Sequence, residues 1–398
     1  MLELKDFEAA ADRLKNVIHN IPLSTSATFS AMTGAEVYLK YENQQKTGSF
    51  KVRGAYNKIM KRYAEGDLHA VVASSAGNHA QGVAFAASSV GVKSTIVMPR
   101  STPIAKVSAT QGYGADVVLA GNIYDEAYAK ACEICEETGA EFIHPFDDPM
   151  VIAGQGTIGL EIMDDLPDVD TIVVPIGGGG LASGVASAVK MLHPNVRVIG
   201  VQAAGAAGMK ASIEAGHVIS LDTAKTIADG IAVKKPGELT FALCSKYLDE
   251  IVTVDDDEIA QAILFLMERG KMVAEGAGAA PVAAIMNRKF DVSGKVAAVI
   301  SGGNIDVTMI SRIIEKGLLR AGRMTKLRIL MQDRPGQLEM ASRIIAAEGA
   351  NVMVVHHDRT DVDLDIRDAI LEITMETQDR EHAQRVIDAL RANGFKVS

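Results

Sequence analysis

The sequence predicts an α/β protein: a large part built on a parallel sheet wrapped by helices, followed by a small α+β part. Three observations support this fold class. Short β-branched runs alternate with amphipathic helical segments over most of the chain, which is typical of parallel sheets covered by helices. Nearly every predicted strand ends in a Gly, Pro or Ser turn. From about residue 325 the predicted order changes to βαββαβ.

The residue pattern predicts each element in turn. Apolar, β-branched runs predict strands at 37–41, 70–74, 94–98, 116–120, 141–144, 171–175, 196–201, 251–254 and 296–300. Helical spacing of apolar residues predicts helices at 52–62, 82–89, 104–111, 124–137, 180–192 and 257–269. Beyond residue 325 we expect strands at 326–331, 351–356, 369–376 and 395–397, and helices at 338–348 and 380–392. In open α/β sheets ligands bind at the carboxyl ends of the strands, so a site is expected in those turns.

Composition and charge narrow the class of protein. The 398 residues suffice for two or three domains with large cores. Apolar stretches are short, below the roughly 20 residues of a membrane span, and the mixed-charge N-terminus does not resemble a signal peptide. A net charge of −10 disfavours nucleic acid and anionic membranes as partners. Three cysteines, Cys132, Cys135 and Cys244, make no disulfide framework or zinc-site spacing. We expect a cytoplasmic protein without a bound metal.

Lys51 is the first candidate for chemistry. It follows Phe50 and stands at the head of the predicted helix 52–62, where packing can hold it for use as an amine nucleophile. Most of the 40 Lys and Arg residues must be solvated surface charges, so Lys51 alone is a weak candidate. Three turns at the ends of distant strands strengthen it.

The first turn, residues 74–82, follows the strand 70–74 and reads Ser-Ser-Ala-Gly-Asn-His-Ala-Gln-Gly. Its free backbone N–H groups could hold a carboxylate at the start of a helix, although a plain strand-to-helix turn would look similar. The third turn, residues 301–306, follows the strand 296–300 and begins with Ser301. A hydroxyl there can hydrogen-bond a neutral ring nitrogen, and the alternative is a plain Ser-Gly-Gly turn.

The second turn contains four successive glycines, residues 177–180, which open the helix 180–192. Glycine carries an entropic penalty that close backbone approach to a phosphate at a helix N-terminus can offset. A dinucleotide fingerprint would require an acidic residue about 20 positions further on, but residues 200–202 are Gly-Val-Gln. This pattern favours a phosphate-bearing cofactor without a ribose over NAD.

Residues 49–55, 75–82, 177–180 and 301–304 occur in this order in a known family. The sequence resembles the fold type II, pyridoxal-phosphate-dependent threonine/serine dehydratases (threonine ammonia-lyases), over roughly residues 5–320. The resemblance implies a catalytic domain at 1–320 with two open, twisted α/β subdomains, the smaller at about 40–150. It implies elimination of ammonia from L-threonine to give 2-oxobutyrate, with side activity on L-serine giving pyruvate.

The resemblance also implies the roles of particular residues. Lys51 would carry pyridoxal 5′-phosphate (PLP) as a Schiff base and, once freed, remove the substrate α-proton, with Phe50 packed against it. Asn78 would bond the ring hydroxyl of the cofactor, and Ser301 would bond its pyridine nitrogen. The phosphate would be held by the segment Gly177, Gly178, Gly179, Gly180 and Leu181. The substrate carboxylate would be held by Ser75, Ala76, Gly77 and Asn78. Glu275 matches the acidic residue that the family places near the cofactor.

Other functions of the same fold stay open. Serine racemases have a second serine where this chain has Ala76, and without a hydroxyl two-base racemisation loses its second base. β-Replacement enzymes and threonine synthase also share the fold, but no motif for a second substrate of β-replacement is evident. Some relatives bind a divalent cation through carboxylates after the strand ending near Val201, and residues 202–208 have none. From another class, an amino-acid sensor with a weakly active core is conceivable; the intact Lys51 and glycine turn argue against it.

The C-terminal residues 325–398 predict a ferredoxin-like βαββαβ domain. Its turn at 333–336, Asp-Arg-Pro-Gly, resembles that of ACT domains, which bind amino acids at domain interfaces, and Gly336 would allow close approach of the ligand backbone. We expect a regulatory role rather than dimerisation alone. Isoleucine or valine is the expected effector, the expected assembly is a homodimer or homotetramer, and isoleucine biosynthesis and threonine catabolism both stay open.

Overall fold

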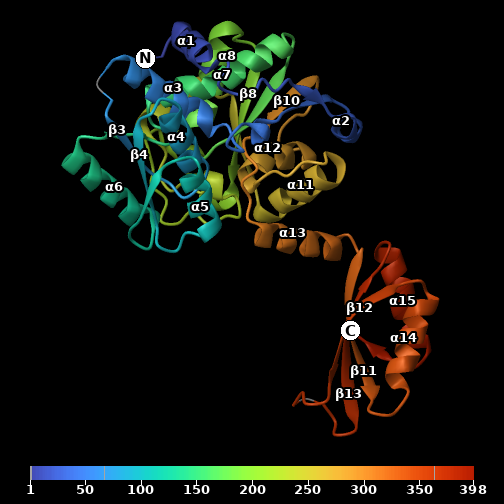
Figure 1. The fold of residues 1–398 in the computed structure, drawn as a ribbon. Coiled ribbons are helices and arrows are strands. Elements are labelled where there is room, and N and C mark those ends of the chain that lie inside the picture. Colours follow the sequence, from blue (N-terminus) through green and yellow to red (C-terminus); the bar gives the residue numbers. More distant parts are fainter. Residues whose placement is uncertain (1, 67, 363) are drawn as a thin grey trace. The chain divides into compact units, whose positions relative to one another are not determined.

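A computed structural model describes residues 2–66, 68–362 and 364–398 (Figure 1). The chain divides into two compact units, Met1–Ile305 and Asp306–Ser398. This division assigns helix α13 (Val307–Arg320) to the second unit, whereas the sequence analysis places the boundary after residue 320. Within the described residues, no helix has both the length and the apolar character needed to cross a bilayer.

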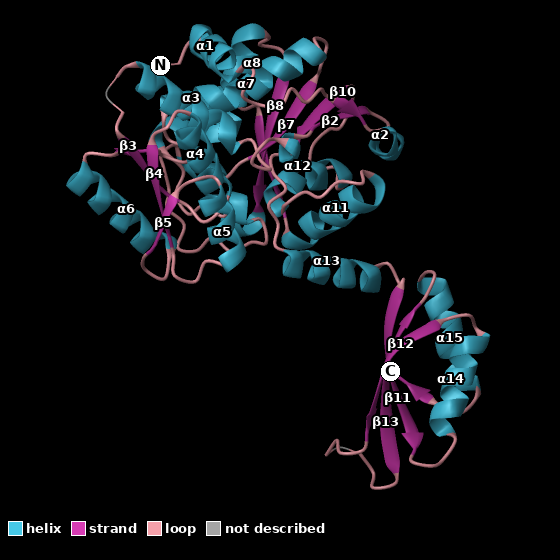
Figure 2. Cartoon of the chain, viewed as in Figure 1, coloured by secondary structure: helices cyan, strands magenta, loops and turns pink. Residues whose placement is uncertain are grey.

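The first unit contains two sheets, seen as separate magenta groups in Figure 2. The larger has the order β1-β2-β10-β7-β8-β9, comprising β1 (Ser24–Thr25), β2 (Glu36–Lys40), β10 (Lys295–Val299), β7 (Thr171–Pro175), β8 (Arg197–Ala203) and β9 (Glu250–Val254). The smaller has the order β5-β4-β3-β6, comprising β5 (Asp116–Leu119), β4 (Lys93–Met98), β3 (Ala70–Ser74) and β6 (Glu141–Phe142). All of these pairings are parallel except that of β1 with β2. The prediction of an α/β fold with parallel sheets is therefore confirmed.

Helices surround both sheets of the first unit. They are α1 (Leu4–Leu14), α2 (Ala27–Thr33), α3 (Lys51–Ala64), α4 (Asn78–Ser89), α5 (Ile104–Gly112), α6 (Tyr124–Thr138), α7 (Pro149–Asp165), α8 (Gly180–Leu192), α9 (Gly208–Ala215), α10 (Glu238–Tyr247), α11 (Asp256–Arg269) and α12 (Gly276–Met286). Short 3₁₀ turns are η1 (Glu42–Gln44), η2 (Ala204–Ala206) and η3 (Asp229–Ile231). No helix was predicted at α1, α2, α7, α9, α10, α12 or α13. Of these, α7 and α12 are buried on most of their surface. A helix without a polar face lacks the periodicity by which amphipathic helices are recognised.

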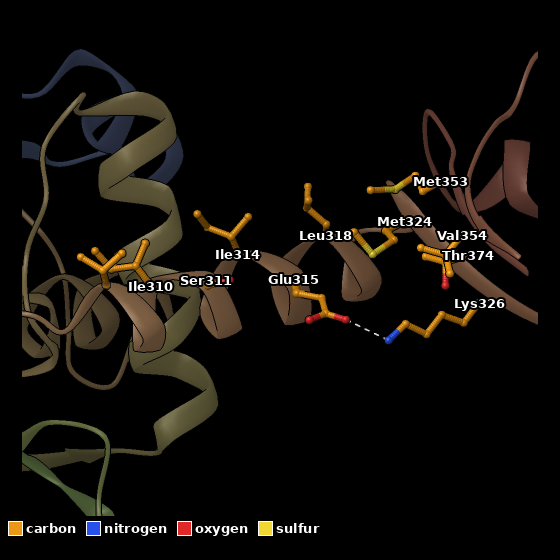
Figure 3. A pocket seen from close by; sticks show the side chains of 11 residues that line it. Ile310, Ser311, Ile314, Glu315, Leu318, Met324, Lys326, Met353, Val354 and Thr374 are labelled. Atoms are coloured by element: carbon orange, nitrogen blue, oxygen red, sulfur yellow. Dashed lines mark hydrogen bonds and ion pairs between the residues drawn. The ribbon is translucent and has the colours of Figure 1, made fainter. Parts of the chain in front are cut away.

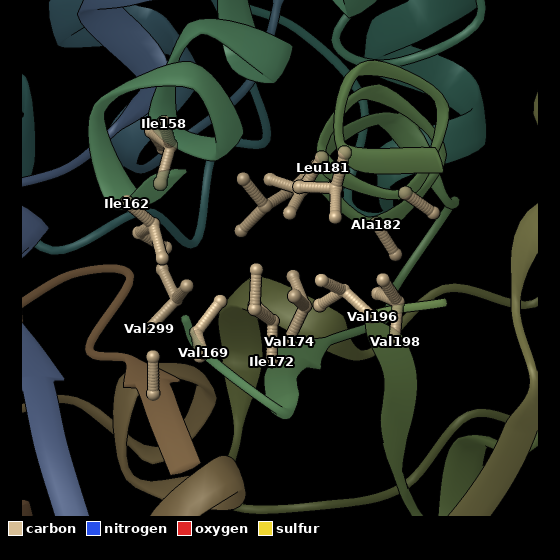
Figure 4. Close-up of a cluster of buried hydrophobic side chains, with 14 of the residues drawn as sticks. Ile158, Ile162, Val169, Ile172, Val174, Leu181, Ala182, Val196, Val198 and Val299 are labelled. Atoms are coloured by element: carbon tan, nitrogen blue, oxygen red, sulfur yellow. The ribbon is translucent and has the colours of Figure 1, made fainter. Parts of the chain in front are cut away.

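The core of the larger sheet includes Ile176 and Leu181, the residues on either side of the glycine turn. Figure 4 shows apolar side chains from α7, α8, β7 and β8 facing one another. Leu181, the second residue of α8, is 5% exposed and packs in this cluster. The buried side chain of Leu181 thus fixes the first turn of α8, and with it the end of the preceding glycine loop.

The second unit forms an antiparallel sheet with the order β12-β13-β11-β14. Its elements follow as β11 (Met324–Gln332), α14 (Gln337–Ala347), β12 (Asn351–Asp358), β13 (Asp368–Glu376), α15 (Arg380–Ala392) and β14 (Lys396–Val397). Helices α14 and α15 cover one face and enclose an apolar core (Figure 2).

Helix α13 and residues of the same sheet line an open groove in the second unit (Figure 3). Ile310, Ile314 and Leu318 line it from the helix, and the ion pair between Lys326 and Glu315 at 2.8 Å lies beside them. The groove is mainly apolar in its lining side chains.

Candidate active site

Lys51 is the first residue of α3, which follows β2, the turn η1 and a loop of residues 45–50. Its Nζ donates a hydrogen bond to the carbonyl oxygen of Pro145 at 2.7 Å and lies 5.3 Å from the centre of the Phe50 ring. Removal from water lowers the pKa of Lys51 to about 8, and the negative charge of Glu275 opposes this shift. An amine with a pKa near physiological pH has a substantial neutral fraction, which is the nucleophilic form.

Backbone hydrogen bonds join the Lys51 segment to the turn after β10. The amide of Phe50 donates to the carbonyl of Ser301 at 3.0 Å, and Ser49 forms an isolated bridge with Gly302. The amide of Gly303 donates to the carbonyl of Gly48 at 2.9 Å. The Lys51 segment and the turn at 301–306, which the sequence singles out separately, are therefore neighbours in space.

Asn78 adds the turn after β3 to this group. Its Nδ2 donates to the Oε1 of Glu275 at 2.7 Å, and its Oδ1 accepts from Asn304. Burial raises the pKa of Glu275 to about 7, while the hydrogen bond from Asn78 lowers it. Only glycine fits beside this pair, because a Cβ on Gly302 would lie 2.4 Å from the Glu275 oxygen.

The four glycines lie between β7 and α8. Gly179 has a φ of +99°, which favours glycine. Among the described residues, the amides of Gly177, Gly178 and Gly179 donate no hydrogen bond, so these N–H groups are available to an anion at the N-terminus of α8. Leu181 can contribute only its backbone, since its side chain lies in the core.

Two hydroxyls near Lys51 are left unpaired. The Oγ atoms of Ser301 and Ser49 are buried and have no hydrogen-bond partner among residues 2–66, 68–362 and 364–398. A buried polar group without a partner is unfavourable unless a bound molecule supplies one. The combination of a partly neutral amine, unpaired amides and a buried hydroxyl suits a ligand with a carbonyl group, a phosphate and a ring nitrogen.

The proposed carboxylate loop lies at the N-terminus of α4. The Oγ of Ser75 accepts from the amide of Gly77 at 3.2 Å, and a Cβ on Gly77 would meet nothing within 4 Å. No hydrogen bond joins residues 75–77 to Lys51 in the described part of the chain. Gly336 belongs to the second unit, where it precedes α14 with a φ of +91°.

The sequence analysis did not single out the loop after β6. It contributes Pro145 to Lys51, and the ring of Phe146 covers the glycine loop so closely that a Cβ on Gly178 would lie 2.5 Å from it. The carboxylate of Asp147 accepts from the amides of Glu238 and Thr240 at 3.1 and 3.0 Å, which fastens the loop to α10. The only signal for this loop in the sequence was its position at the end of a predicted strand.

Comparison with known proteins defines the class. The family described as pyridoxal-phosphate dependent enzyme matches residues 14–302, and the chain belongs to this family. It is 55% identical to the L-threonine ammonia-lyase of Thermotoga maritima over 398 residues, which is 100% of this chain and 99% of the relative. Among solved structures, maize serine racemase has a TM-score of 0.75 and 35% identity, covering 80% of this chain and 98% of the other. The processed form of threonine deaminase isoform 2 from Solanum lycopersicum has a TM-score of 0.74 and 39% identity, with 79% and 94% coverage.

Proposed function

We propose that this chain is a PLP-dependent threonine ammonia-lyase that converts L-threonine to 2-oxobutyrate and ammonia and also acts on L-serine. The observation that carries the proposal is Lys51 itself: its pKa is lowered to about 8, and the residue before it, Phe50, is hydrogen-bonded through its backbone to Ser301. The full-length similarity to a threonine ammonia-lyase supports the choice of substrate.

The chain's own residues would bind the cofactor as follows. The amides of the glycine loop at the start of α8 would hold the phosphate, and the buried Oγ of Ser301 would hydrogen-bond the ring nitrogen. Asn78 reaches the ring hydroxyl from a side chain that Glu275 and Asn304 orient. When bound, PLP supplies an electron sink for the negative charge that develops at the substrate Cα.

Lys51 has two tasks in the proposed reaction. Its Nζ would hold the cofactor, and the same Nζ, when free, would accept the α-proton of the substrate. Residues 75–78 hold the substrate carboxylate at the N-terminus of α4. This fixes the Cα near Lys51, and a positioned base accounts for roughly 10²–10⁴-fold of a typical enzymatic rate.

The test is an assay of 2-oxo acid formation from L-threonine by the PLP-loaded protein, with Lys51→Ala as the control. We expect turnover only in the unaltered protein, with the control retaining the same circular dichroism spectrum and thermal unfolding midpoint within a few degrees. Turnover by the unaltered protein that does not exceed the control would exclude the proposed activity.

For the second unit we propose an ACT-like regulatory role in a homo-oligomer. The βαββαβ order and the turn that ends at Gly336 support this role. Isoleucine or valine is expected to shift the threonine saturation curve of the full chain and to have no effect after deletion of residues 325–398. Superimposable curves with and without each amino acid would leave this unit only a role in assembly, which sedimentation of the two forms would measure.

A further inference from the structure

Arg53 lies two residues after Lys51 and is fully buried. Its Nε and Nη2 donate to the two carboxylate oxygens of Glu42 at 2.8 and 2.7 Å. Its Nη1 and Nη2 donate to the two oxygens of Glu161 at 2.5 and 2.8 Å, and Nη1 also donates to the Oγ1 of Thr157 at 3.0 Å. The guanidinium group has five N–H donors, and these contacts use all of them.

A second buried cation completes the network. Lys40, the last residue of β2, has a fully buried side chain whose Nζ contacts Glu161 at 2.7 Å and donates to the carbonyl of Ile21 at 2.6 Å. Lys40 also lies 3.8 Å from the carboxylate of Asp165, so the two cations face three carboxylates. Such networks are poor sources of stability, because desolvation offsets the attraction. A fixed geometry is a better explanation for keeping one here than added stability.

The network encloses the segment that carries the candidate lysine. Glu42 and Arg53 are 11 residues apart, and their pairing closes a loop that contains Ser49, Phe50 and Lys51. Arg53 also lies in the first turn of α3, where a cation opposes the helix dipole. The helix dipole therefore disfavours a positive charge at this position. The carboxylates of Glu42 and Glu161 compensate for this unfavourable interaction.

Glu161 extends the network to α7, which contains it. Helix α7 packs so closely against α3 and α8 that glycines are needed at the contacts. A Cβ on Gly154 would lie 2.6 Å from the carbonyl oxygen of Arg53. A Cβ on Gly184, in α8, would lie 2.5 Å from the carbonyl oxygen of Ile152. Through these contacts Arg53 connects the start of α3 to the helix that follows the glycine loop.

We propose that Arg53 is a positioning residue: its two bidentate pairs, to Glu42 on η1 and Glu161 on α7, fix Lys51 relative to the glycine loop at the start of α8. The inference rests on the proposed role of Lys51 and goes beyond it, since Arg53 contacts neither substrate nor cofactor in this role. Because a lysine side chain cannot form two bidentate pairs, Arg53→Lys retains the charge and removes the geometry.

The test compares Arg53→Lys and Glu42→Gln with the unaltered protein. We expect both variants to fold. We expect the cofactor-free Arg53→Lys protein to bind PLP about tenfold more weakly than the cofactor-free unaltered protein, as measured by absorbance titration without substrate. We expect kcat for threonine to fall by about tenfold or more in Arg53→Lys, with KM changed by less than about threefold. Glu42→Gln keeps the bidentate pair between Arg53 and Glu161. It should therefore lower PLP affinity and kcat in the same way, but by smaller factors.

Lys190→Met is the matched control, because it removes an ion pair with Asp249 at 2.9 Å that lies outside the network. It should leave PLP affinity and kcat unchanged. If Arg53→Lys fails to fold, the outcome for Glu42→Gln decides. Unchanged PLP affinity and kcat in the folded variants, or equal losses in Lys190→Met, would overturn the proposal. The cofactor titration keeps this outcome separate from a failure of the threonine activity itself.

Discussion

The Nδ2 of Asn78 and the Oε1 of Glu275 lie 2.7 Å apart and join the start of α4 to the residue before α12. This contact places an acidic group with a pKa raised to about 7 by burial in the same site as the partly neutral Lys51. Near neutral pH the site therefore contains two groups that both exchange protons readily.

The pKa of Glu275 predicts how pH affects the stability of the cofactor-free protein. Its usual value is 4.5, and the folded protein raises it to about 7, so the folded state binds this proton more tightly than the unfolded chain. Between these two values the free energy of unfolding should fall with rising pH by about 3 kcal/mol from this group, and it should be constant above them. Glu275→Gln should remove this contribution. Urea unfolding of both proteins at about pH 5 and about pH 8 measures it, and equal pH dependence in the two would contradict the prediction.

The contact between Phe146 and the glycine loop predicts a steric effect. Gly178→Ala places a Cβ 2.5 Å from the Phe146 ring, which should lower the free energy of unfolding by about 1–3 kcal/mol and weaken PLP binding. Adding Phe146→Ala should recover part of the PLP affinity, because the two changes share one space. Gly112→Ala is the control, since a Cβ there meets nothing within 4 Å. Additive losses in the double variant would show that the ring is not the obstacle.

The absence of a hydroxyl at Ala76 predicts the stereochemical outcome of the reaction. We expect L-serine to give pyruvate without accumulation of D-serine in the unaltered protein, because no second base is available at this position. Ala76→Ser should produce measurable D-serine by chiral chromatography while retaining elimination. D-serine accumulating faster than pyruvate in the unaltered protein would instead favour the racemase alternative.

The environment of Gln202 predicts insensitivity to chelators. Its buried side chain donates from Nε2 to the carbonyl of Ala206 at 3.2 Å and accepts from the amide of Lys210 at 2.8 Å. The side-chain nitrogen of Gln202 thus provides the carbonyl oxygen of Ala206 with a hydrogen bond, and this oxygen does not need a cation as its partner. We expect the threonine activity and the thermal unfolding midpoint to be unchanged after dialysis against a chelator. A loss that calcium or magnesium restores would contradict this.

How much could be predicted from the sequence differed between elements. Strand β7 (Thr171–Pro175) and helix α8 (Gly180–Leu192) lie where the sequence analysis expects them, because short apolar runs and glycine turns are local signals. The analysis also names Asn78 and Glu275, which the structure places in contact. In parallel sheets the turns after the strands lie at the same edge, so the positions of the motifs after predicted strands were enough to predict that they share one site.

The interactions that were missed depend on long-range packing. Arg53 and Glu161 are 108 residues apart, and no local pattern pairs one carboxylate among 50 acidic residues with that arginine. Helix α12 carries Pro281 in its interior and is buried all round, so its sequence lacks both the periodicity and the composition by which helices are recognised. Asn304 lay within a turn that the analysis examined, but its contact with Asn78 required the three-dimensional arrangement.

The buried network around Arg53 has a consequence for how the site responds to its surroundings. Desolvation opposes the charge on Arg53, but Glu42 and Glu161 raise its pKa above the ordinary arginine value. Its charge is therefore constant at every pH at which the protein folds. Arg53 therefore does not respond to pH, whereas Glu275, whose pKa is raised to about 7, titrates near neutrality. Acidification near neutrality should thus change the chemistry of the bound ligand while the framework that holds Lys51 stays as it is.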